Sequence, residues 1–398
     1  MKERIILHCD LNNFFASVSL LSNQTLYDMP VAVCGSVEER HGIVLAKNEI
    51  AKRYGVKTAE TVWQAKAKCP DLVTLPPDYN KYKEYSKRAF SIYERYTDLI
   101  EPFGIDECWL DVTGSRLLFG DGEQIANRIR NEIKTELGIT VSVGVSFNKV
   151  FAKLGSDMKK PDAVTVISRE NFKDKVWGLP AGDLLFVGKN TVKRLNDCGI
   201  LTIGDLTKCD DKMLERLLGK NGISLKRYAL GKDDSPVSHK DAVNIPKSVG
   251  RSVTPSRDIK TEAEVWKIFL TLSEEISRNL RKYGLNAYGV TVHTRNTALS
   301  VKETTKALDI PVNTAIGIAK RGIELFRQCY KWETPLRSVG LRAVNLKPDS
   351  QTACQQDLFG NTEDFIQEEL IENCFQSVRE KFGNQSLKRA TTIESLDD

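Results

Sequence analysis

The sequence predicts a multidomain protein of the α+β class. Its 398 residues exceed what one ordinary hydrophobic core accommodates, so two to four domains are expected. With 41% apolar and 28% charged residues, the composition is that of a soluble globular protein. Strand-like and helical segments alternate in two blocks, residues 4–165 and 247–348, and an all-helical stretch lies between them.

The first block predicts one antiparallel sheet with an inserted subdomain. Its segments include, in chain order, a strand at 4–10, a helix at 13–21, apolar runs at 31–35 and 42–46, a long amphipathic helix at 79–96, two strands around a short turn within 97–111, a helix at 124–137 and a strand at 140–145. This βα, insertion, αββαβ order favours a sheet with helices on one face.

The second half predicts two further folding units. Residues 179–230 read as helices, and Gly231 to Pro236 have the composition of an exposed linker. Residues 247–345 follow a βαββαβ order, which is typical of an independent small α+β domain.

Composition also excludes several classes of protein. No apolar run approaches the roughly 18 residues of a membrane span, and the first residues do not resemble a signal peptide. Nine cysteines include no C-x-x-C pair, and most lie in apolar segments, which predicts reduced thiols in a cytosolic protein. Scattered histidines without paired ligand spacing argue against a zinc site.

The charge is unevenly distributed, although the net charge is only +5. Residues 245–348 contain 18 Lys and Arg against 9 Asp and Glu, whereas residues 349–398 contain 4 basic and 11 acidic residues. This pattern indicates a polyanion-binding module followed by an acidic tail whose function differs from that of the basic module.

Carboxylates stand at the ends of two predicted strands. Asp10 ends the first apolar run, and Asp106-Glu107 precede another. Hard divalent cations prefer such oxygen ligands, and three carboxylates could hold two ions for a phosphoryl displacement. The alternative is that Asp10 caps a helix while Asp106 and Glu107 cap a turn. Neighbours on one strand face opposite ways, so both could reach the ions only with help from the preceding turn.

Several motifs, in this order along the chain, resemble those of Y-family (translesion) DNA polymerases of the polymerase IV group. The chain resembles a divergent subgroup of that group. The motifs are Asp10 with Phe14-Phe15, the pair Asp106-Glu107, the run 144–153, and Asp157 to Pro161. The resemblance implies a right-hand architecture. Its expected parts are a palm at 1–12 and 76–165, fingers at 13–75, a helical thumb at 166–233, a linker at 234–246, a little finger at 247–348 and an acidic tail at 349–398.

The resemblance also implies an activity, template-directed DNA synthesis past damaged bases without proofreading. Asp10, Asp106 and Glu107, with the Leu11 carbonyl, would hold two Mg²⁺ ions for nucleotidyl transfer. Primed template DNA and deoxynucleoside triphosphates would be the partners of a monomeric enzyme in the bacterial cytosol, with the nucleoid.

Four further residues are expected at the incoming nucleotide. The resemblance makes Phe15 the steric gate that excludes a ribose 2′-hydroxyl. Phe14 would lie beside it, although a core position for Phe14 is an open alternative. Lys52 and Lys160 would contact the triphosphate.

The fingers depart from the family pattern. Ala46, Glu49 and Lys52 stand where a threonine, a tyrosine and an arginine are usual, and Gly104 stands where a serine is common. Near a phosphate, Glu49 would repel unless it pairs with Lys47 or Arg53. A lysine at position 52 lacks the bidentate fork of arginine.

DNA contacts are expected in two places. The turn Val187-Gly188-Lys189 resembles a helix-hairpin-helix, which presents backbone N–H groups to a phosphate; an ordinary helical corner is the alternative. In the basic block, residues on or beside strands would follow the DNA backbone. These are Lys247, Arg251, Arg257, Arg295, Lys302 and Arg342.

The tail contains a short motif that resembles the sliding-clamp peptide of bacterial polymerases. Its expected contact residues are Gln355, Asp357, Leu358 and Phe359. A helix is predicted beyond it at 365–381, without an identified partner.

Two rival functions remain at this stage. A palm-fold nucleotide cyclase would share the two-metal chemistry but would need neither the helical hairpin nor the basic domain. A catalytically silent, clamp-tethered DNA-binding protein would share everything except the reaction.

Overall fold

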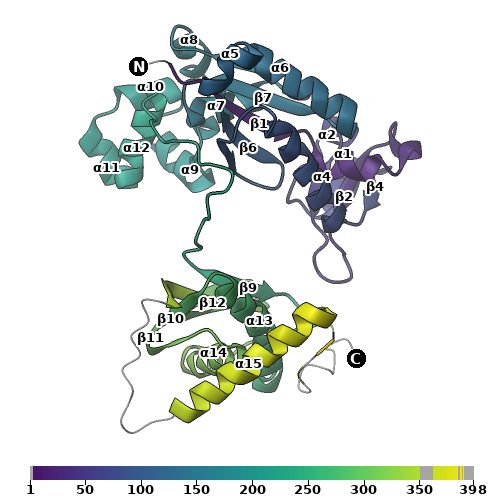
Figure 1. Cartoon of the computed structure of the whole chain (residues 1–398), viewed down its shortest axis with the longest axis vertical. Coiled ribbons are helices and arrows are strands. Elements are labelled where there is room, and N and C mark those ends of the chain that lie inside the picture. The colour runs from purple at the N-terminus through teal and green to yellow at the C-terminus, as the bar shows by residue number, and fades with distance from the viewer. Residues whose placement is uncertain (1–2, 350–361, 384–385, 388, 390–398) are drawn as a thin grey trace. The chain divides into compact units, whose positions relative to one another are not determined.

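A computed structural model describes residues 3–349, 362–383, 386–387 and 389. The chain divides into two compact units (Figure 1). Unit 1 comprises residues 1–37 and 42–242, and unit 2 comprises 38–41 and 243–398. Both combine sheets with helices, so the predicted α+β class is confirmed. Within the described part of the chain, no helix has the length and apolar character to span a membrane.

A five-stranded sheet forms the centre of unit 1. Its order is β5 (Ile100–Pro102), β6 (Glu107–Asp111), β1 (Ile6–Leu11), β7 (Val141–Ser146) and β8 (Val164–Ile167). The central strand β1 is antiparallel to both β6 and β7, but β8 runs parallel to β7. The prediction of a purely antiparallel sheet is therefore wrong at this edge, because the chain crosses over through a helix before adding β8.

Helices lie on both faces of this sheet rather than on one. Leu7, Cys9 and Leu11 share a buried core with the long helix α4 (Tyr79–Tyr93) and with α6 (Gly122–Glu132), which a π-turn at Ile133–Leu137 extends. On the opposite face α7 (Lys149–Met158) packs against β1 and β7. The sequence analysis did not predict a helix on this second face, because α7 contacts the sheet through small residues rather than through an apolar stripe.

The inserted subdomain has its own small core. Its sheet has the order β3 (Val44–Lys47), β2 (Val31–Cys34) and β4 (Val73–Leu75). The accompanying helices are α1 (Phe14–Leu20), the 3-10 turn Gln24–Leu26, α2 (Glu49–Arg53) and α3 (Val62–Lys68). Ala51, Val62 and Ala65 from the helices pack on Ala32 and Val44 from the strands.

The helical stretch predicted at 179–230 is confirmed, but its first helix begins earlier, at Phe172. Its helices are α8 (Phe172–Val176), the 3-10 turn Ala181–Asp183, α9 (Lys189–Asp197), α10 (Ile203–Lys208), α11 (Asp211–Leu218) and α12 (Lys220–Ala229). Val166 and Ile167 belong to β8, so the sheet extends two residues beyond the predicted boundary at 165. A 3-10 turn at Thr113–Ser115 and α5 (Arg116–Phe119) complete unit 1.

The predicted linker at 234–246 is only partly a linker. Val237 is buried in a small cluster with Ile6 and Trp109. The backbone N–H of Ser238 donates to the Glu101 carboxylate at 3.0 Å, and that of Lys240 donates to the Asp98 carbonyl at 2.9 Å. Residues up to 242 therefore belong to unit 1, because their backbone groups find partners there.

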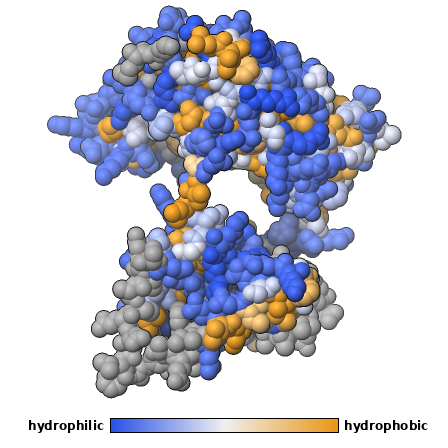
Figure 2. Space-filling view, viewed as in Figure 1, coloured by the Kyte–Doolittle hydropathy of each residue, from blue (hydrophilic) through white to orange (hydrophobic). Residues whose placement is uncertain are grey.

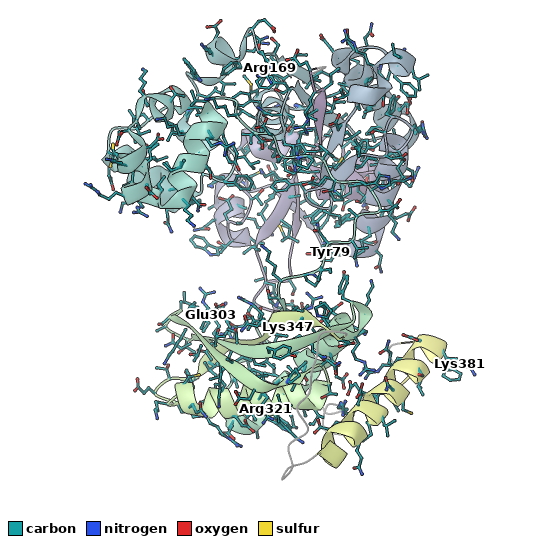
Figure 3. All side chains as sticks on the ribbon, turned by 60° about the vertical axis from the view of Figure 1, so that its left-hand side comes forward. Tyr79, Arg169, Glu303, Arg321, Lys347 and Lys381 are labelled. Atoms are coloured by element: carbon teal, nitrogen blue, oxygen red, sulfur yellow. The ribbon has the colours of Figure 1, made fainter. Side chains whose placement is uncertain are left out.

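Unit 2 contains the predicted βαββαβ arrangement. Its sheet has the order β11 (Val301–Val312), β10 (Leu285–Asn296), β12 (Leu336–Pro348) and β9 (Val249–Val253). Helices α13 (Glu262–Lys282) and α14 (Ala315–Cys329) cover one face and bury Phe269 and Phe326 against it. Figure 3 shows Glu303 and Lys347 on the sheet side of unit 2 and Arg321 on the helical side.

A further helix, α15 (Thr362–Phe382), lies against the helical side of unit 2. Arg379 pairs with Glu274 of α13 at 2.9 Å, and Glu368 pairs with Lys320 of α14 at 2.7 Å. Its exposed side chains include Leu370 and Ile371. Figure 2 shows an apolar area on unit 2. The helix predicted at 365–381 thus has a partner within its own chain.

Candidate active site

Strand register brings the predicted carboxylates together. Asp10 lies directly opposite Glu107 on the antiparallel strands β1 and β6, so both side chains leave the same face of the sheet. Asp106 precedes β6 in a bend, and its carbonyl accepts from the Leu11 N–H at 3.0 Å. Because Asp106 is outside the strand, the alternation of strand side chains does not separate it from Glu107.

The negative charges of two of these carboxyl groups act on the third, Asp106. Burial and the negative charges of Asp10 and Glu107 raise the pKa of Asp106 to about 6. Burial also acts to raise the pKa of Glu107, but the adjacent His8 imidazole and Lys153 ammonium outweigh it and lower that pKa to about 2. Asp106 is therefore the member of this group whose negative charge is least compensated.

Two ammonium groups lie among these oxygens. Lys153 Nζ is 2.6 Å from Glu107 Oε2 and 3.1 Å from Asp10 Oδ2. Lys160 Nζ is 2.7 Å from Asp10 Oδ2 and 2.9 Å from Asp157 Oδ1. Burial acts to lower the pKa of Lys153, but the surrounding carboxylates outweigh it and raise that pKa, so this lysine keeps its charge.

His8 is a component that the sequence analysis missed. Its ring is fully buried, with Nδ1 2.9 Å from Ser156 Oγ and Nε2 3.4 Å from Glu107 Oε2. Its position was the available signal, since a residue two before Asp10 on a strand shares the face of Asp10. The imidazole thus lies behind Glu107 and limits where that carboxylate can turn.

The donor set fits a hard divalent cation, because Asp10, Asp106 and Glu107 offer only oxygen and carry uncompensated charge at Asp106. Leu11 is buried at the end of β1 beside them. Among the residues that the structure describes, no three His, Cys, Asp or Glu side chains already stand in a coordinating arrangement.

Phe14 and Phe15 have different surroundings. Phe14 is buried in the core, as the alternative reading expected. Phe15 is half-buried, stacks on Tyr82 with ring centroids 4.2 Å apart, and meets Tyr79 edge-on. Tyr82 was not singled out by the sequence, because its place in a tyrosine-rich helix resembled ordinary core.

Glu49 has polar partners in the structure. It pairs with Lys52 at 3.5 Å and accepts from Asn13 Nδ2 at 2.9 Å, rather than pairing with Lys47 or Arg53. Lys47 instead donates to Thr58 Oγ1 at 2.9 Å. Spacing of three residues on α2 places Lys52 beside Glu49, which leaves Lys52 with an acidic partner before any nucleotide arrives.

The turn at Val187-Gly188-Lys189 leads into α9, and Gly188 is the N-cap residue of this helix. Phe186 before it adopts a positive φ of 70°, as a tight turn requires. The preceding arm is the 3-10 turn Ala181–Asp183, so only one arm of the expected hairpin is an α-helix.

The basic residues of unit 2 divide between two faces. Arg342 lies opposite Thr291 and Arg295 opposite Ser338, and these positions share the face that α13 and α14 leave open. Arg251 instead lies opposite the core residue Leu341.

Arg251 and Lys302 are engaged on the helical side. Arg251 pairs with Glu275 of α13 at 2.5 Å, and Lys302 donates to the Cys329 carbonyl at the end of α14 at 3.1 Å. Strand alternation therefore directs these two residues away from the face that carries Arg295 and Arg342. The predicted clamp residues Gln355, Asp357, Leu358 and Phe359 lie outside the described residues.

Comparisons with known proteins identify the family of this chain. The model of the impB/mucB/samB family matches residues 9–157, and the model of its C-terminal domain matches residues 246–358. DNA polymerase IV of Acetivibrio thermocellus is 49% identical over 98% of both chains. DNA polymerase IV 1 of Bacillus subtilis is 36% identical over 99% of this chain and 94% of its own.

A solved structure shares the architecture. The Y-family DNA polymerase chimera Dbh-Dpo4(243-245)-Dbh superposes with a TM-score of 0.76, at 25% identity, over 86% of this chain and 99% of that one. The chain therefore belongs to the impB/mucB/samB family, and it has the fold of a Y-family DNA polymerase. Within that class it belongs to the polymerase IV group.

Proposed function

We propose that this protein copies template DNA past damaged bases, using the carboxylates at the ends of β1 and β6 as its catalytic centre. It is a DNA-directed DNA polymerase that uses divalent metal, with template DNA and nucleotides as substrates. The observation that carries the assignment of the centre is the register of Asp10 against Glu107 with Asp106 in the adjoining bend.

Two Mg²⁺ ions are the proposed cofactors. Asp10, Asp106 and Glu107, with the Leu11 carbonyl, would hold them. When bound, such ions lower the pKa of the attacking hydroxyl and neutralise charge on the leaving phosphates. The protein contributes position: the strand pair fixes Asp10 and Glu107, and His8 limits the rotation of Glu107.

Four residues are proposed to contact the incoming nucleotide or to shape its site. Lys160 would turn its ammonium from Asp10 toward the triphosphate, and Lys52 would add charge from the fingers once released from Glu49. Phe15 would exclude a ribose 2′-hydroxyl by contact with the sugar. Phe14 would support Phe15 from the core rather than touch the nucleotide, as its burial favours.

The right-hand parts are proposed with corrected boundaries. The palm extends to residue 167, the thumb follows to 233, residues 234–242 remain with unit 1, and the little finger begins after residue 246. DNA phosphates would be held by the turn at 187–189 and by the open sheet face with Arg295 and Arg342. We place the enzyme in the cytosol as a monomer.

A sliding clamp is the proposed protein partner, through the motif Gln355, Asp357, Leu358 and Phe359. An apolar anchor pair in such a motif carries most of the binding energy. Replacing Leu358 and Phe359 together by alanine should weaken clamp binding by roughly 2 kcal/mol or more. The same variant should extend primers normally without the clamp; unchanged clamp affinity would refute the assignment.

Single-nucleotide extension of a primed template with Mg²⁺ tests the function. The proposed enzyme adds the templated nucleotide to the primer, opposite both intact and damaged template bases. A nucleotide cyclase would yield cyclic product without primer, and a silent DNA-binding protein would shift the DNA in a gel without extending it. Either of those results would overturn the proposal.

A further inference from the structure

A buried ammonium lies where the carboxylates of the proposed centre meet. Lys153 Nζ is 2.6 Å from Glu107 Oε2 and 3.1 Å from Asp10 Oδ2. These oxygens belong to neighbouring strands, so one cation bridges β6 and β1. The Lys153 side chain is 13% exposed, which makes this an enclosed charge. A divalent cation bound by the same oxygens would need the same space.

The backbone of Lys153 cannot withdraw from this position. A Cβ on Gly144 would lie 1.9 Å from the Ala152 carbonyl oxygen and 2.5 Å from the Ser156 nitrogen, so α7 touches β7 directly. Ser156 Oγ also donates to the Lys153 carbonyl at 2.8 Å. The ammonium can therefore leave the carboxylates only by rotation of its side chain.

A third carboxylate, Asp157, also contacts that ammonium. Asp157 is one turn further along α7, and its Oδ2 is 3.2 Å from Lys153 Nζ. Its side chain is 46% exposed, so it faces solvent rather than the enclosed centre. Asp157 also pairs with Lys160 and is not one of the proposed metal ligands. Lys153 is thus shared between two ligand carboxylates and one carboxylate outside the ligand set.

We propose that Lys153 is an internal counter-ion that occupies the cation site of the metal-free protein and moves to Asp157 when a divalent ion binds. The inference rests on the proposed function and adds a property to its metal site. In the free protein the ammonium holds Asp10 and Glu107 together against their mutual repulsion. The same ammonium competes with metal, so the unloaded enzyme binds divalent ions weakly.

Binding of Mn²⁺ alone tests this idea on the full chain, without DNA or nucleotide. Electron paramagnetic resonance of free Mn²⁺ gives the dissociation constant. Lys153→Met removes the charge and keeps the chain length, and should tighten Mn²⁺ binding about tenfold. Lys149→Met is the matched control on the same helix, because Lys149 pairs with Glu101 at 2.6 Å instead; it should change affinity less than about twofold. Unchanged or weaker binding by Lys153→Met overturns the proposal.

Asp157→Asn tests the movement separately. With Lys153 present, loss of the Asp157 carboxylate, its partner outside the ligand set, should weaken Mn²⁺ binding about threefold or more. In the Lys153→Met background the same change should have a smaller effect, because no ammonium needs to be relocated. Equal effects in both backgrounds would show simple long-range attraction by Asp157 and would overturn the movement.

Asp106→Asn separates this inference from the proposed function. It should abolish Mn²⁺ binding if the carboxylates are the metal site. Unaffected binding in that variant would refute the proposed metal site itself, whereas loss of binding there with no gain in Lys153→Met would refute only the counter-ion. Thermal unfolding verifies that each variant is folded, and Lys153→Gln makes the same test should Lys153→Met not fold.

Discussion

Tyr82 lies parallel to Phe15, with ring centroids 4.2 Å apart and planes inclined by only 9°. Tyr82 is fully buried, and its hydroxyl lies 2.8 Å from Ser19 Oγ, so its ring has a fixed position. Stacking of this kind contributes about 0.5–1.5 kcal/mol beyond buried area. The Phe15 ring is therefore held in one orientation by a residue that the strand-and-helix pattern of the sequence did not single out.

Phe15→Ala should raise ribonucleotide incorporation relative to deoxyribonucleotide incorporation by roughly 10–200-fold, because contact with a single hydroxyl is worth about 1–3 kcal/mol. Primer extension with each nucleotide gives the two kcat/KM values. Deoxyribonucleotide incorporation is the internal control and should fall far less than the selectivity. Unaltered sugar discrimination would show that the ring is only part of the core.

Asp106→Asn should lower single-nucleotide incorporation at least about a thousandfold, roughly 4 kcal/mol in transition-state free energy. The substitution preserves shape and removes the charge needed for a cation. Affinity for primed template, measured by fluorescence anisotropy, should stay within about threefold, because the proposed phosphate contacts lie in other parts of the chain. Substantial residual extension by this variant would contradict the assignment.

The stability of the metal-free protein should depend on Asp106 in a particular pH window. Its pKa is raised from 3.8 to about 6 in the folded state. Between these values the folded protein binds more protons than the unfolded chain, so stability falls as pH rises from about 4 to 6. The destabilisation is complete above that window.

Asp106→Asn should therefore be more stable than the natural protein by about 1–2 kcal/mol at pH 7.5, after allowance for solvent screening. The gain should shrink at pH 4.5. Urea unfolding in the presence of a chelator measures both. Glu107 does not alter this comparison, because its pKa is lowered to about 2. Its contribution to the free energy of unfolding is therefore lost only at more acidic pH. A gain that is the same at both pH values would contradict the prediction.

The two faces of unit 2 should differ in their response to salt. Replacing Arg295 and Arg342 by alanine should reduce the slope of log affinity for DNA against log salt by about 0.9 per lost phosphate contact. Arg251→Ala is the matched control, since its guanidinium pairs with Glu275 on the helical side. An equal loss of slope in both variants would contradict the division of the basic residues between faces.

Docking of α15 should depend on Glu274 and not on its neighbour. Glu274 accepts from Arg379 at 2.9 Å and from Arg389 at 3.1 Å, whereas Glu275 pairs with Arg251. Glu274→Ala leaves two largely enclosed guanidinium groups without this partner, which should cost about 2–4 kcal/mol of docking free energy. Hydrogen exchange should accelerate in α15 but not in α13. Glu275→Ala should leave exchange of α15 unchanged.

The local pattern of the sequence was enough for the element order as far as β7 and for the placement of carboxylates at strand ends, but not for α7 and β8. An apolar run that ends in Asp10 and a turn before Asp106 and Glu107 are short-range signals, so they predicted strands with carboxylates at their ends. The βαββαβ order of unit 2 was predictable for the same reason. The alternation of neighbouring strand residues also explains why Arg295 could be expected on an exposed face.

Long-range contacts decided the rest, because they depend on which distant segments meet. Only folding places Lys153 among Asp10 and Glu107, stacks Tyr82 on Phe15, directs Arg251 toward Glu275, and closes α15 onto α13. Sequence by itself determined which side chains are available and the period with which they recur along each element. The tertiary structure alone decided which charges share an enclosure, since burial and opposite charge act through space rather than along the chain.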